Sequence, residues 1–339
     1  MKIENKRTFV IAEAGVNHNG SIKKALKLIE VAKQSGADAI KFQTFKAENL
    51  ATDYAPKAQY QNYKSQKKET QFQMLKKLEF TEAMHNECFK ECKKKKIIFI
   101  SSAFDEDSLN FLKKINIKIF KVPSGEINNT PYLELLGKFK KKVILSTGMS
   151  NILDIDKAIK TLVQNGTSKN NITLMQCTSS YPAPFEEINL RVINSLKKKF
   201  KLRVGFSDHS LGFIASIVAA AVGAKVIEKH ITLDKKLDGP DHKSSLNPRE
   251  FKLMIDDIRM VEKILGSEIK DITFSERKNI NIVRKSIVAS RFIKKNEKFS
   301  IENITCKRPG TGISPIFFKK LLGKKSVKNF NADDLIRFK

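Results

Sequence analysis

The sequence predicts an α/β fold, a (β/α)₈ TIM barrel followed by a small β-rich domain, on three observations. Eight short runs rich in Val, Ile and Phe alternate with longer segments of helical apolar period, which is typical of a parallel sheet covered by helices. The eight units occupy about 260 residues, close to the ~250 residues of such barrels. The alternation stops after Gly266, and short β-like pieces with Asn and Gly turns follow.

The expected elements of the barrel follow one another along the chain. The strands are expected to begin near Phe9, Ala39, Ile97, Ile119, Val143, Ile172, Val204 and Val226. The helices after them are expected, in order, at residues 22–35, 81–95, 106–115, 130–139, 152–165, 190–200, 212–222 and 248–265. The first helix shows the pattern clearly. Ser21 can cap it, and Leu26, Ile29 and Ala32 line one face.

An open doubly wound sheet is the structural alternative to a barrel. Such a sheet usually binds a nucleotide at a Gly-rich first turn, but residues 13–20 read EAGVNHNG and lack the GxGxxG spacing. The barrel is therefore favoured, with residues 1–265 as the barrel, 266–283 as a linker and 284–339 as the small domain. The connection at residues 46–80 is long enough to indicate a lid or binding loop.

Composition limits the classes of function. A net charge of +28 is compatible with nucleic-acid binding, but the Lys residues are spread over predicted helix faces and turns, so we expect no nucleic-acid partner. The four cysteines form no CxxC pair, which indicates reduced thiols. No apolar run approaches the ~20 residues of a membrane span. We therefore expect a cytoplasmic protein that does not enter a membrane.

Reactive side chains collect at the expected carboxyl ends of the strands, where barrel enzymes carry their active sites. In chain order these ends carry Glu13; Lys41 and Gln43; Ser101 and Ser102; Lys121, Ser124 and Glu126; Ser146 and Thr147; Thr178, Ser179 and Tyr181; Ser207, Asp208 and His209; and Glu228, Lys229 and His230. One such residue would mean little, but eight strand ends together indicate a single active site.

Two of the five histidines, His209 and His230, end neighbouring strands. Adjacent strands lie about 4.8 Å apart, so two imidazoles at matching heights can share a metal ion, with Glu13 across the mouth. Two histidines and a carboxylate would suit Fe²⁺ or Zn²⁺ as well as Mn²⁺ or Mg²⁺. Of the other histidines, His18 is a candidate hydrogen-bond partner in a tight turn, and His85 is expected at the surface of its helix.

Lysine and serine side chains at the strand ends form a second group. The ammonium and hydroxyl donors that phosphate recognition requires are supplied by Lys41, Lys121, Ser124, Ser146 and Ser207. Glu126, two residues beyond Ser124, is the best-placed carboxylate for proton transfer. The group therefore predicts an anion site with a proton-transfer residue beside it.

The motifs at these positions resemble those of the sialic acid synthase family. They are GVNHNG after Glu13, KFQ at 41–43, KVPSGE at 121–126, STGM at 146–149, SDHS at 207–210, EKH at 228–230 and GPDH at 239–242. The likeness runs through essentially the whole chain. It includes KRPGTGISP at 307–315, which is similar to the antifreeze-like (SAF) domain that ends these enzymes. The chain departs from many relatives at residues 101–104, where SSAF stands in place of STPF.

The resemblance implies a condensation of phosphoenolpyruvate with an N-acylhexosamine. His209 and His230 would hold one Mn²⁺ or Mg²⁺ ion. Phosphoenolpyruvate would be bound by Lys41, Lys121, Ser124, Ser146, Ser179 and Ser207. The sugar would be bound by Glu13, Gln43, Tyr181, Asp241 and Arg308. Glu126 and Glu13 would be the catalytic carboxylates, and Arg308 would reach the pocket of the other subunit in a domain-exchanged homodimer.

Four readings of the function are open at this point. The motifs favour N-acetylmannosamine, which would give N-acetylneuraminate. They also fit 2,4-diacetamido-2,4,6-trideoxymannose, which would give N,N'-diacetyllegionaminate. A Schiff-base aldolase would use Lys41, Lys121 or Lys229 as its amine. A basic nucleic-acid-binding protein is the fourth reading.

Overall fold

A computed structural model describes residues 7–58, 61 and 69–337 of the chain. The chain divides into two compact units, residues 1–266 and residues 267–339. The first unit holds a closed barrel of eight strands, and the second holds a two-stranded antiparallel sheet. No helix within the described ranges has the length and apolar character that a membrane span requires.

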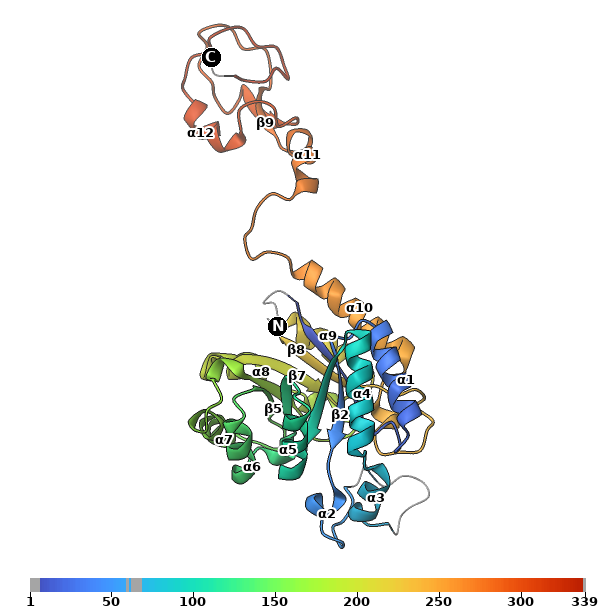
Figure 1. The fold of residues 1–339 in the computed structure, drawn as a ribbon. Helices are drawn as coiled ribbons and strands as arrows, with labels where there is room; N and C mark the ends of the chain where they lie inside the picture. The colour runs from blue at the N-terminus through green and yellow to red at the C-terminus, as the bar shows by residue number, and fades with distance from the viewer. Residues whose placement is uncertain (1–6, 59–60, 62–68, 338–339) are drawn as a thin grey trace. The chain divides into compact units, whose positions relative to one another are not determined.

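The eight barrel strands follow one another in sequence order, and β1 closes the barrel by pairing with β8 (Figure 1). They are β1 (Phe9–Gly15), β2 (Ala39–Thr44), β3 (Ile98–Ala103), β4 (Ile119–Val122), β5 (Lys142–Ser146), β6 (Ile172–Cys177), β7 (Arg203–Asp208) and β8 (Val226–His230). Every pairing in the barrel is parallel. The predicted fold class is confirmed.

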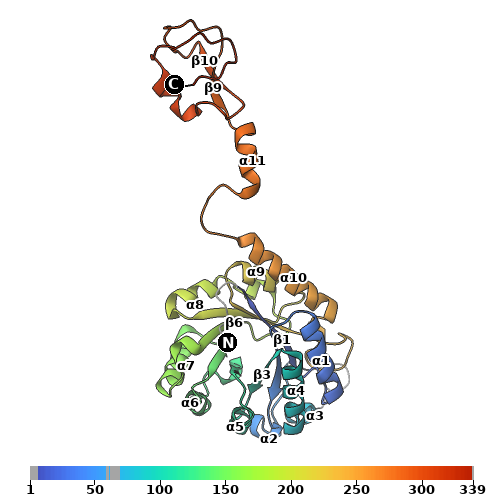
Figure 2. The same cartoon turned by 45° about the horizontal axis from the view of Figure 1, so that its top comes forward.

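Helices surround the barrel as an outer ring, as Figure 2 shows. They are α1 (Ile22–Gln34), α4 (Glu82–Lys95), α5 (Glu106–Lys114), α6 (Thr130–Lys138), α7 (Ile152–Gln164), α8 (Val192–Phe200), α9 (Ile214–Ala221) and α10 (Pro248–Leu265). Side-chain caps define where they begin. Ser21 accepts a hydrogen bond from the backbone of Lys24, and Asn247 forms a capping box with Glu250. Short 3₁₀ helices in the loops are η2 (Ser124–Glu126), η3 (Lys169–Asn171), η4 (Phe185–Glu187) and η5 (His242–Ser244).

Apolar side chains pack on both sides of the barrel wall. Those that face outward pack under the helices, for example Ile40, Phe42 and Phe120. Those that face inward form a separate cluster, the inner core: Phe9, Ile11, Ala39, Ile100, Ile119, Ile144, Met175 and Val226. Because alternate residues of a strand point to the same face, the residue two positions beyond each inner-core side chain is also aimed into the barrel. The polar residues that end the strands therefore converge in its mouth.

The long connection after β2 contains two short helices that the sequence analysis did not predict, α2 (Ala47–Leu50) and α3 (Gln71–Leu78). We call residues 46–80 the cap segment. Thr70 and Gln73 form a capping box at the start of α3. Apolar side chains of both helices pack with Val16 and Phe45, which lie next to β1 and β2. This apolar cluster fixes α2 and α3 beside the mouth of the barrel.

His85 is buried, so its predicted surface position is wrong. It lies on the inner face of α4 together with Cys88 and Cys92. Its Nε2 is 2.8 Å from Thr44 Oγ1, and its Nδ1 is 3.0 Å from Thr81 O. Burial lowers the pKa of His85 below its ordinary value. Positions 85, 88 and 92 share one face of a helix, so the sequence did contain a signal for burial.

The second unit has an apolar core of its own. Its elements are α11 (Phe274–Val283), β9 (Ser286–Ala289), β10 (Ile304–Lys307), η6 (Pro315–Phe317) and α12 (Phe318–Leu321). Its buried apolar side chains are Ile287, Ala289, Ile293, Phe299, Ile304, Leu321, Phe330 and Ile336. Helix α11 lies in the segment expected to be a linker, and it begins at a capping box between Thr273 and Glu276. The boundaries at residues 265 and 284 stay predictions.

Candidate active site

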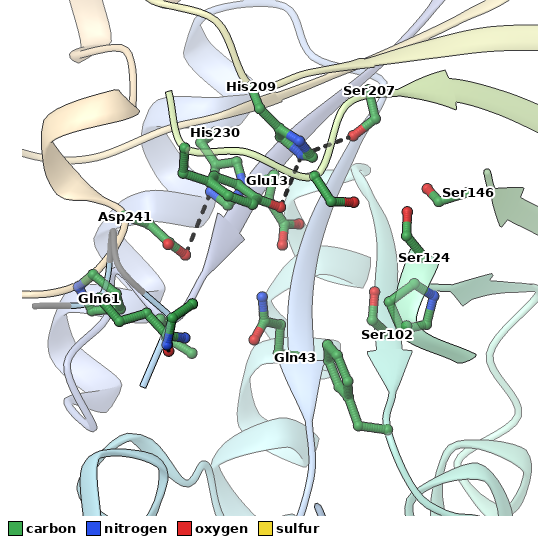
Figure 3. A pocket seen from close by; sticks show the side chains of 18 of the residues that line it. Glu13, Gln43, Gln61, Ser102, Ser124, Ser146, Ser207, His209, His230 and Asp241 are labelled. Carbon is green, nitrogen blue, oxygen red and sulfur yellow. Dashed lines mark hydrogen bonds and ion pairs between the residues drawn. The ribbon is translucent and has the colours of Figure 1, made fainter. Parts of the chain in front are cut away.

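A cavity of about 430 Å³ opens at the carboxyl ends of the barrel strands. The predicted site residues that line it are Glu13, Lys41, Gln43, Lys121, Ser124, Glu126, Ser146, Ser179, Tyr181, Ser207, His209, His230 and Asp241. Figure 3 shows several of them converging from different strands. The volume is in the range of small-molecule sites. The structure thus brings together the predicted site residues of the barrel, whereas Arg308 belongs to the second unit.

Sheet register explains why residues from both ends of the barrel sequence meet in this cavity. Glu13 of β1 is in register with Lys41 of β2 and with His230 of β8. Ser207 of β7 is in register with Glu228 of β8. Residues in register on neighbouring parallel strands point to the same face of the sheet. These five side chains therefore share the mouth of the barrel.

Two lysines and two glutamates form a buried charge cluster in the cavity. Lys41 Nζ lies 2.9 Å from Glu13 Oε2 and 3.8 Å from Glu228 Oε2. Lys121 Nζ lies 3.4 Å from Glu228 Oε1. All four side chains are almost completely buried. Such charges are tolerated in a protein interior only when they are paired, and this cluster pairs each of them.

The cluster shifts the pKa values of its members in different directions. Burial raises the pKa of Glu13 to about 7, although Lys41 opposes the shift. Burial also opposes ionisation of Glu228, but Lys121 and Lys41 hold its pKa at about 2. Burial opposes the charged form of Lys41, yet Glu13 and Glu228 raise its pKa above the ordinary value. Burial lowers the pKa of Lys121. The ionised form of Glu228 therefore faces two amines, and when the Glu13 carboxyl is protonated the cluster keeps one positive charge for an incoming anion.

Hydroxyl groups line the cavity together with Lys121 at the ends of β4, β5 and β6. Lys121 Nζ donates to Ser146 Oγ at 2.7 Å. Gly148 N donates to Ser124 Oγ at 3.1 Å. A Cβ atom at residue 148 would collide with Ser124 Oγ and Ser179 Oγ, so a glycine is required for these hydroxyls to lie against the backbone. Convergent ammonium, hydroxyl and amide donors are the groups that bind a phosphate.

Two imidazoles line the cavity. The ring centroids of His209 and His230 are 5.8 Å apart. His209 Nδ1 is 2.7 Å from Thr178 O, and a carbonyl only accepts, so the proton of the neutral ring is on Nδ1. The lone pair of Nε2 then faces the Tyr181 hydroxyl at 3.1 Å. Burial lowers the pKa of His209 to about 4 and that of His230 well below its ordinary value.

The donor set of this imidazole pair fits a divalent cation. Neutral imidazole nitrogens are metal ligands, and His230 Nδ1 has no hydrogen-bond partner within the described residues. Asp241 Oδ2 is 3.8 Å from this nitrogen, as Figure 3 shows. Among residues 7–58, 61 and 69–337, no group of three or more His, Cys, Asp or Glu side chains has a metal-binding arrangement. A divalent cation bound here would therefore have two protein nitrogens as ligands. Its other coordination positions would be open to substrate or water.

Beyond the imidazoles, three polar side chains converge around Gly15. This residue has a φ of 52°, a conformation that favours glycine. A Cβ atom there would lie 3.2 Å from Glu13 Oε1, 3.4 Å from Asp241 Oδ2 and 3.5 Å from Gln43 Nε2. Burial raises the pKa of Asp241 to about 6. The three side chains present carboxylate and amide groups, which can bind the hydroxyl and acylamino groups of a sugar.

The cap segment contributes an apolar wall to the same cavity. Apolar residues that line the cavity on this side include Val16, Leu50, Met74, Leu75, Leu78 and Phe104. Most of them belong to the apolar cluster that holds α2 and α3 in place, and the others pack against it. Gln61 and Gln71 are the polar lining residues from the same segment. In Figure 3 Gln61 and Asp241 lie on one side of the imidazole pair, whereas Ser124 and Ser146 lie on the other.

Glu126 lies at the edge of the cavity in η2 and is half-buried. Asn129 Nδ2 donates to Glu126 Oε2 at 2.7 Å. Burial raises the pKa of Glu126 above its ordinary value, although the hydrogen bond from Asn129 opposes the shift. A positioned carboxylate of raised pKa is suited to proton transfer.

Some residues that line the cavity were not predicted as site residues, and some candidate residues do not line it. Glu228 and Ser102 line the cavity but were not assigned a role, although each lies two positions beyond an inner-core residue of its strand. Lys229, a candidate amine for an aldolase, is paired with Asp208 and is not a lining residue. Arg308 Nε donates to Val283 O at 3.0 Å within the second unit. The role of Arg308 stays a prediction.

The geometry defines a class of protein, a barrel enzyme with an anion site next to a pair of neutral imidazoles. Comparison with known families makes the class specific. The NeuB family model matches residues 28–270, and the SAF domain model matches residues 284–339. The chain therefore belongs to the NeuB family, the sialic acid synthases, which form a carbon–carbon bond between phosphoenolpyruvate and a sugar.

Individual relatives cover almost the whole chain. The N,N'-diacetyllegionaminic acid synthase of Campylobacter jejuni is 52% identical over 98% of this chain and 99% of its own length. The protein of the same name from Legionella pneumophila is 41% identical over 96% of this chain and 92% of its own length. Among solved structures, the N-acetylneuraminic acid synthetase of Leptospira borgpetersenii is 33% identical with a TM-score of 0.72. That match covers 81% of this chain and 91% of the other.

Proposed function

We propose that this chain condenses phosphoenolpyruvate with 2,4-diacetamido-2,4,6-trideoxymannose and water to give N,N'-diacetyllegionaminate and phosphate. The observation that carries the proposal is the order of groups along one cavity. A lysine and serine cradle lies on one side of the imidazole pair, and sugar-binding groups with an apolar wall lie on the other. This order matches an anionic reactant and a polar reactant that meet at the imidazoles.

Phosphoenolpyruvate would lie in the cradle, with its phosphate against Lys121, Ser124 and Ser146. Lys41 would bind the carboxylate, because its ammonium faces the middle of the cavity between Glu13 and Glu228. Ser179 and Ser207 would complete the set of donors. Paired lysines provide charge that is already desolvated and oriented before the anion binds, which lowers the reorganisation needed during the reaction.

The aldehyde end of the open-chain sugar would lie at the imidazole pair. His209 and His230 would hold Mn²⁺ or Mg²⁺, and the bound ion would polarise the aldehyde oxygen. Glu13 and Asp241 would orient the sugar hydroxyls, and Tyr181 would close over the ring of His209, whose centroid lies 4.1 Å from its own. C3 of phosphoenolpyruvate would thus be held close to the aldehyde carbon.

Glu126 would handle the proton transfer of the second half of the reaction. After the carbon–carbon bond forms, water adds at C2 of the former phosphoenolpyruvate, and a base must take its proton. Glu126 borders the cradle directly beyond Ser124 and is held by Asn129, so its carboxylate is positioned for this step. The C2–O bond to phosphate then breaks, and phosphate leaves the cradle.

The sugar is chosen on two grounds. The relative that is 52% identical acts, by its name, in N,N'-diacetyllegionaminic acid synthesis. The apolar wall of Leu50, Met74 and Leu75 would also suit the C6 methyl group and the second acetamido methyl of this sugar. N-acetylmannosamine, which the sequence motifs favour, would place a C6 hydroxyl there, and an unpaired hydroxyl against an apolar surface is unfavourable.

Phosphate release with each sugar tests the proposal. With phosphoenolpyruvate and Mn²⁺, we expect kcat/KM for the diacetamido sugar to exceed that for N-acetylmannosamine by about 100-fold. The reverse preference would assign the chain to N-acetylneuraminate synthesis. EDTA should abolish turnover. Activity that survives EDTA, together with a borohydride-trapped pyruvate adduct, would instead indicate a Schiff-base aldolase.

A substitution in the apolar wall tests the fit of the wall to the sugar's methyl groups independently of the likeness to the relatives. Met74→Gln keeps the length of the side chain but adds an amide, so it should reduce the preference for the diacetamido sugar by about 10-fold. Met260→Gln is the matched control, because Met260 is exposed on α10. An unchanged preference in Met74→Gln would leave only the likeness to the relatives in support of this sugar.

We also propose that the functional unit is a domain-exchanged homodimer in which Arg308 of one subunit serves the pocket of the other. Subunit mixing tests this. Glu126→Gln and Arg308→Ala should each be inactive alone. A mixed dimer contains one complete pocket if Arg308 acts across subunits, so mixing and refolding should restore about a quarter of wild-type activity. If no activity returns on mixing, Arg308 does not act in this way.

A further inference from the structure

A buried ion pair lies on the outer face of the two strands that carry the imidazoles. Lys229 Nζ of β8 is 3.2 Å from Asp208 Oδ1 of β7, and both side chains are fully buried. The two residues are in register. Because strand residues alternate between faces, their sequence neighbours on both sides point into the cavity. The ion pair is therefore separated from the imidazole pair only by the barrel wall.

Asp208 and Lys229 bind every polar group of Ser210, the residue directly after His209. Asp208 Oδ1 accepts from Ser210 N at 2.9 Å and from Ser210 Oγ at 2.6 Å. Lys229 Nζ donates to Ser210 O at 2.6 Å. Asp208 Oδ2 accepts from Ser216 Oγ of α9 at 2.6 Å. The network fixes the backbone on the carboxyl side of His209.

Two further contacts of His209 come from the loop after β6. Ala183 N donates to His209 O at 2.9 Å, and His209 Nδ1 donates to Thr178 O at 2.7 Å. The imidazole is thus held from one side by this loop and from the other by the ion pair. Ser207 Oγ and Tyr181 Oη also contact Nε2, at 3.3 Å and 3.1 Å, so loss of either support would loosen the orientation of the ring toward His230.

Stability alone is a weak reason for such a pair. Removing two charges from water is costly, and a buried ion pair is often no more stable than apolar residues of the same size. A network that orients a metal ligand, by contrast, typically changes metal affinity when it is disturbed. We propose that Asp208 and Lys229 are positioning residues that direct the His209 ring toward His230 and so set the affinity of the imidazole pair for a divalent cation. This inference rests on the metal site of the proposed function.

Mn²⁺ binding to the full chain, followed by electron paramagnetic resonance without substrates, tests the inference. Lys229→Met should raise the Kd for Mn²⁺ by about 10- to 100-fold. The Kd for phosphoenolpyruvate in the absence of metal should stay close to the wild-type value, because the lysine and serine cradle is not altered. Ser216→Ala removes one hydrogen bond to Asp208, and it should raise the Kd for Mn²⁺ by about threefold to tenfold.

Arg259→Met is the control for the loss of a partly buried, paired cation. Arg259 contacts Asp38 at 3.4 Å and Glu262 at 3.0 Å at the amino ends of β1 and β2, far along the strands from the imidazoles. It should lower the thermal stability without changing the Kd for Mn²⁺. A merely structural role of Lys229 would give the same result as this control.

The possible results distinguish failure of this inference from failure of the proposed function. If the wild-type chain does not bind Mn²⁺, the metal site of the proposed function is wrong, and the inference fails with it. If the wild type binds Mn²⁺ but Lys229→Met and Ser216→Ala bind it equally well, the inference alone is overturned. Should Lys229→Met not fold, an unchanged Kd in Ser216→Ala is sufficient to overturn it.

Discussion

The two halves of the barrel interior are built on the same strands but carry opposite kinds of side chain. In the amino-terminal half, the inward residues of β1 to β5 are Ile11, Ala39, Ile100, Ile119 and Ile144. Two positions further along the same strands, the inward residues are Glu13, Lys41, Ser102, Lys121 and Ser146. Both sets are buried. The difference lies in what burial does to each set.

Burial of the apolar half stabilises the fold by about 25 cal/mol per Å² of apolar surface. Burial of the polar half is unfavourable unless each group finds a partner, and the ion pairs among Lys41, Lys121 and Glu228 only partly offset that cost. The comparison shows that the apolar half of the interior stabilises the barrel. The stable barrel in turn keeps the polar half buried and in position. Substitutions in the two halves should therefore have separable effects.

The largest effect is expected in the polar half. Lys121→Met should reduce kcat/KM for phosphoenolpyruvate by about 1000-fold, or about 4 kcal/mol, because the phosphate loses its buried cation. The KM for the sugar should change little. Phosphate-release kinetics measure both. Lys160→Met, which removes an exposed lysine paired with Asp156 in α7, is the control. Equal losses for both substrates would mean that Lys121 supports the whole pocket rather than the anion site.

A substitution in the apolar half should lower the stability of the fold and leave substrate binding unchanged. Ile144→Ala should lower the free energy of unfolding by about 3 kcal/mol, because it leaves a cavity inside the barrel. The KM values of the folded enzyme should stay unchanged. Urea unfolding gives the stability, and Leu153→Ala on the exposed face of α7 is the control. A changed KM with unchanged stability would break the separation between the two halves.

A buried histidine outside both halves tests the effect of pH on the fold. The folded-state pKa of His85 is lowered by burial, so the unfolded chain takes up the proton first as the pH falls below about 6.5. The stability from neutral His85 is therefore complete above that pH and is lost as the pH falls toward the folded-state pKa. His18, whose pKa is lowered to about 3 by burial, acts in the same direction.

His85→Gln should reduce the pH dependence of stability by up to about 1.4 kcal/mol per pH unit below pH 6.5. Urea unfolding at pH 7.5, 6.5 and 5.5 on wild type and variant measures the difference, in buffers of equal ionic strength. Parallel stability profiles for the two proteins would show that His85 keeps its ordinary pKa in the fold.

The smallest effect is expected where the backbone meets the sugar side of the cavity. Gly15→Ala should cost about 1 kcal/mol of stability from its positive φ and should also raise the KM for the sugar, because the new methyl group lies among Glu13, Gln43 and Asp241. Gly223→Ala is the matched control. Gly223 also has a positive φ, but a Cβ atom there meets no other atom within 4 Å. If both variants raise the KM equally, crowding of the pocket is not the cause.

The sequence predicted the barrel well because its signals are local. Eight apolar runs with the correct spacing identify the strands, and the polar residues after them identify the mouth. The pairing partners are not local. That Glu228 lies against both Lys41 and Lys121 depends on barrel closure, so the residue was noticed at its strand end but given no role.

Three other differences between expectation and structure also have physical reasons. His85 was expected at the surface of its helix, but it is buried against Thr44 of a distant strand, a contact that the local pattern does not show. Helix α11 was missed because its apolar side chains do not form a buried face within the second unit, although Thr273 and Glu276 give a recognisable start. The cap segment was expected to be functional, but its apolar wall appears only when α2 and α3 fold beside Val16.

The pairing of β1 with β8 also determines when the pocket can exist. Glu13 and His230 come into register only at this seam, and Asn17 Nδ2 adds bonds across it to Ile231 O at 2.8 Å and Ser245 Oγ at 2.9 Å. A nascent chain on the ribosome that has emerged only as far as β7 holds one imidazole of the pair and an open sheet with two free edges. Synthesis of the last strand therefore closes the sheet and completes the imidazole pair in one step, and a proteolytic nick that removes β8 would abolish activity completely rather than weaken it.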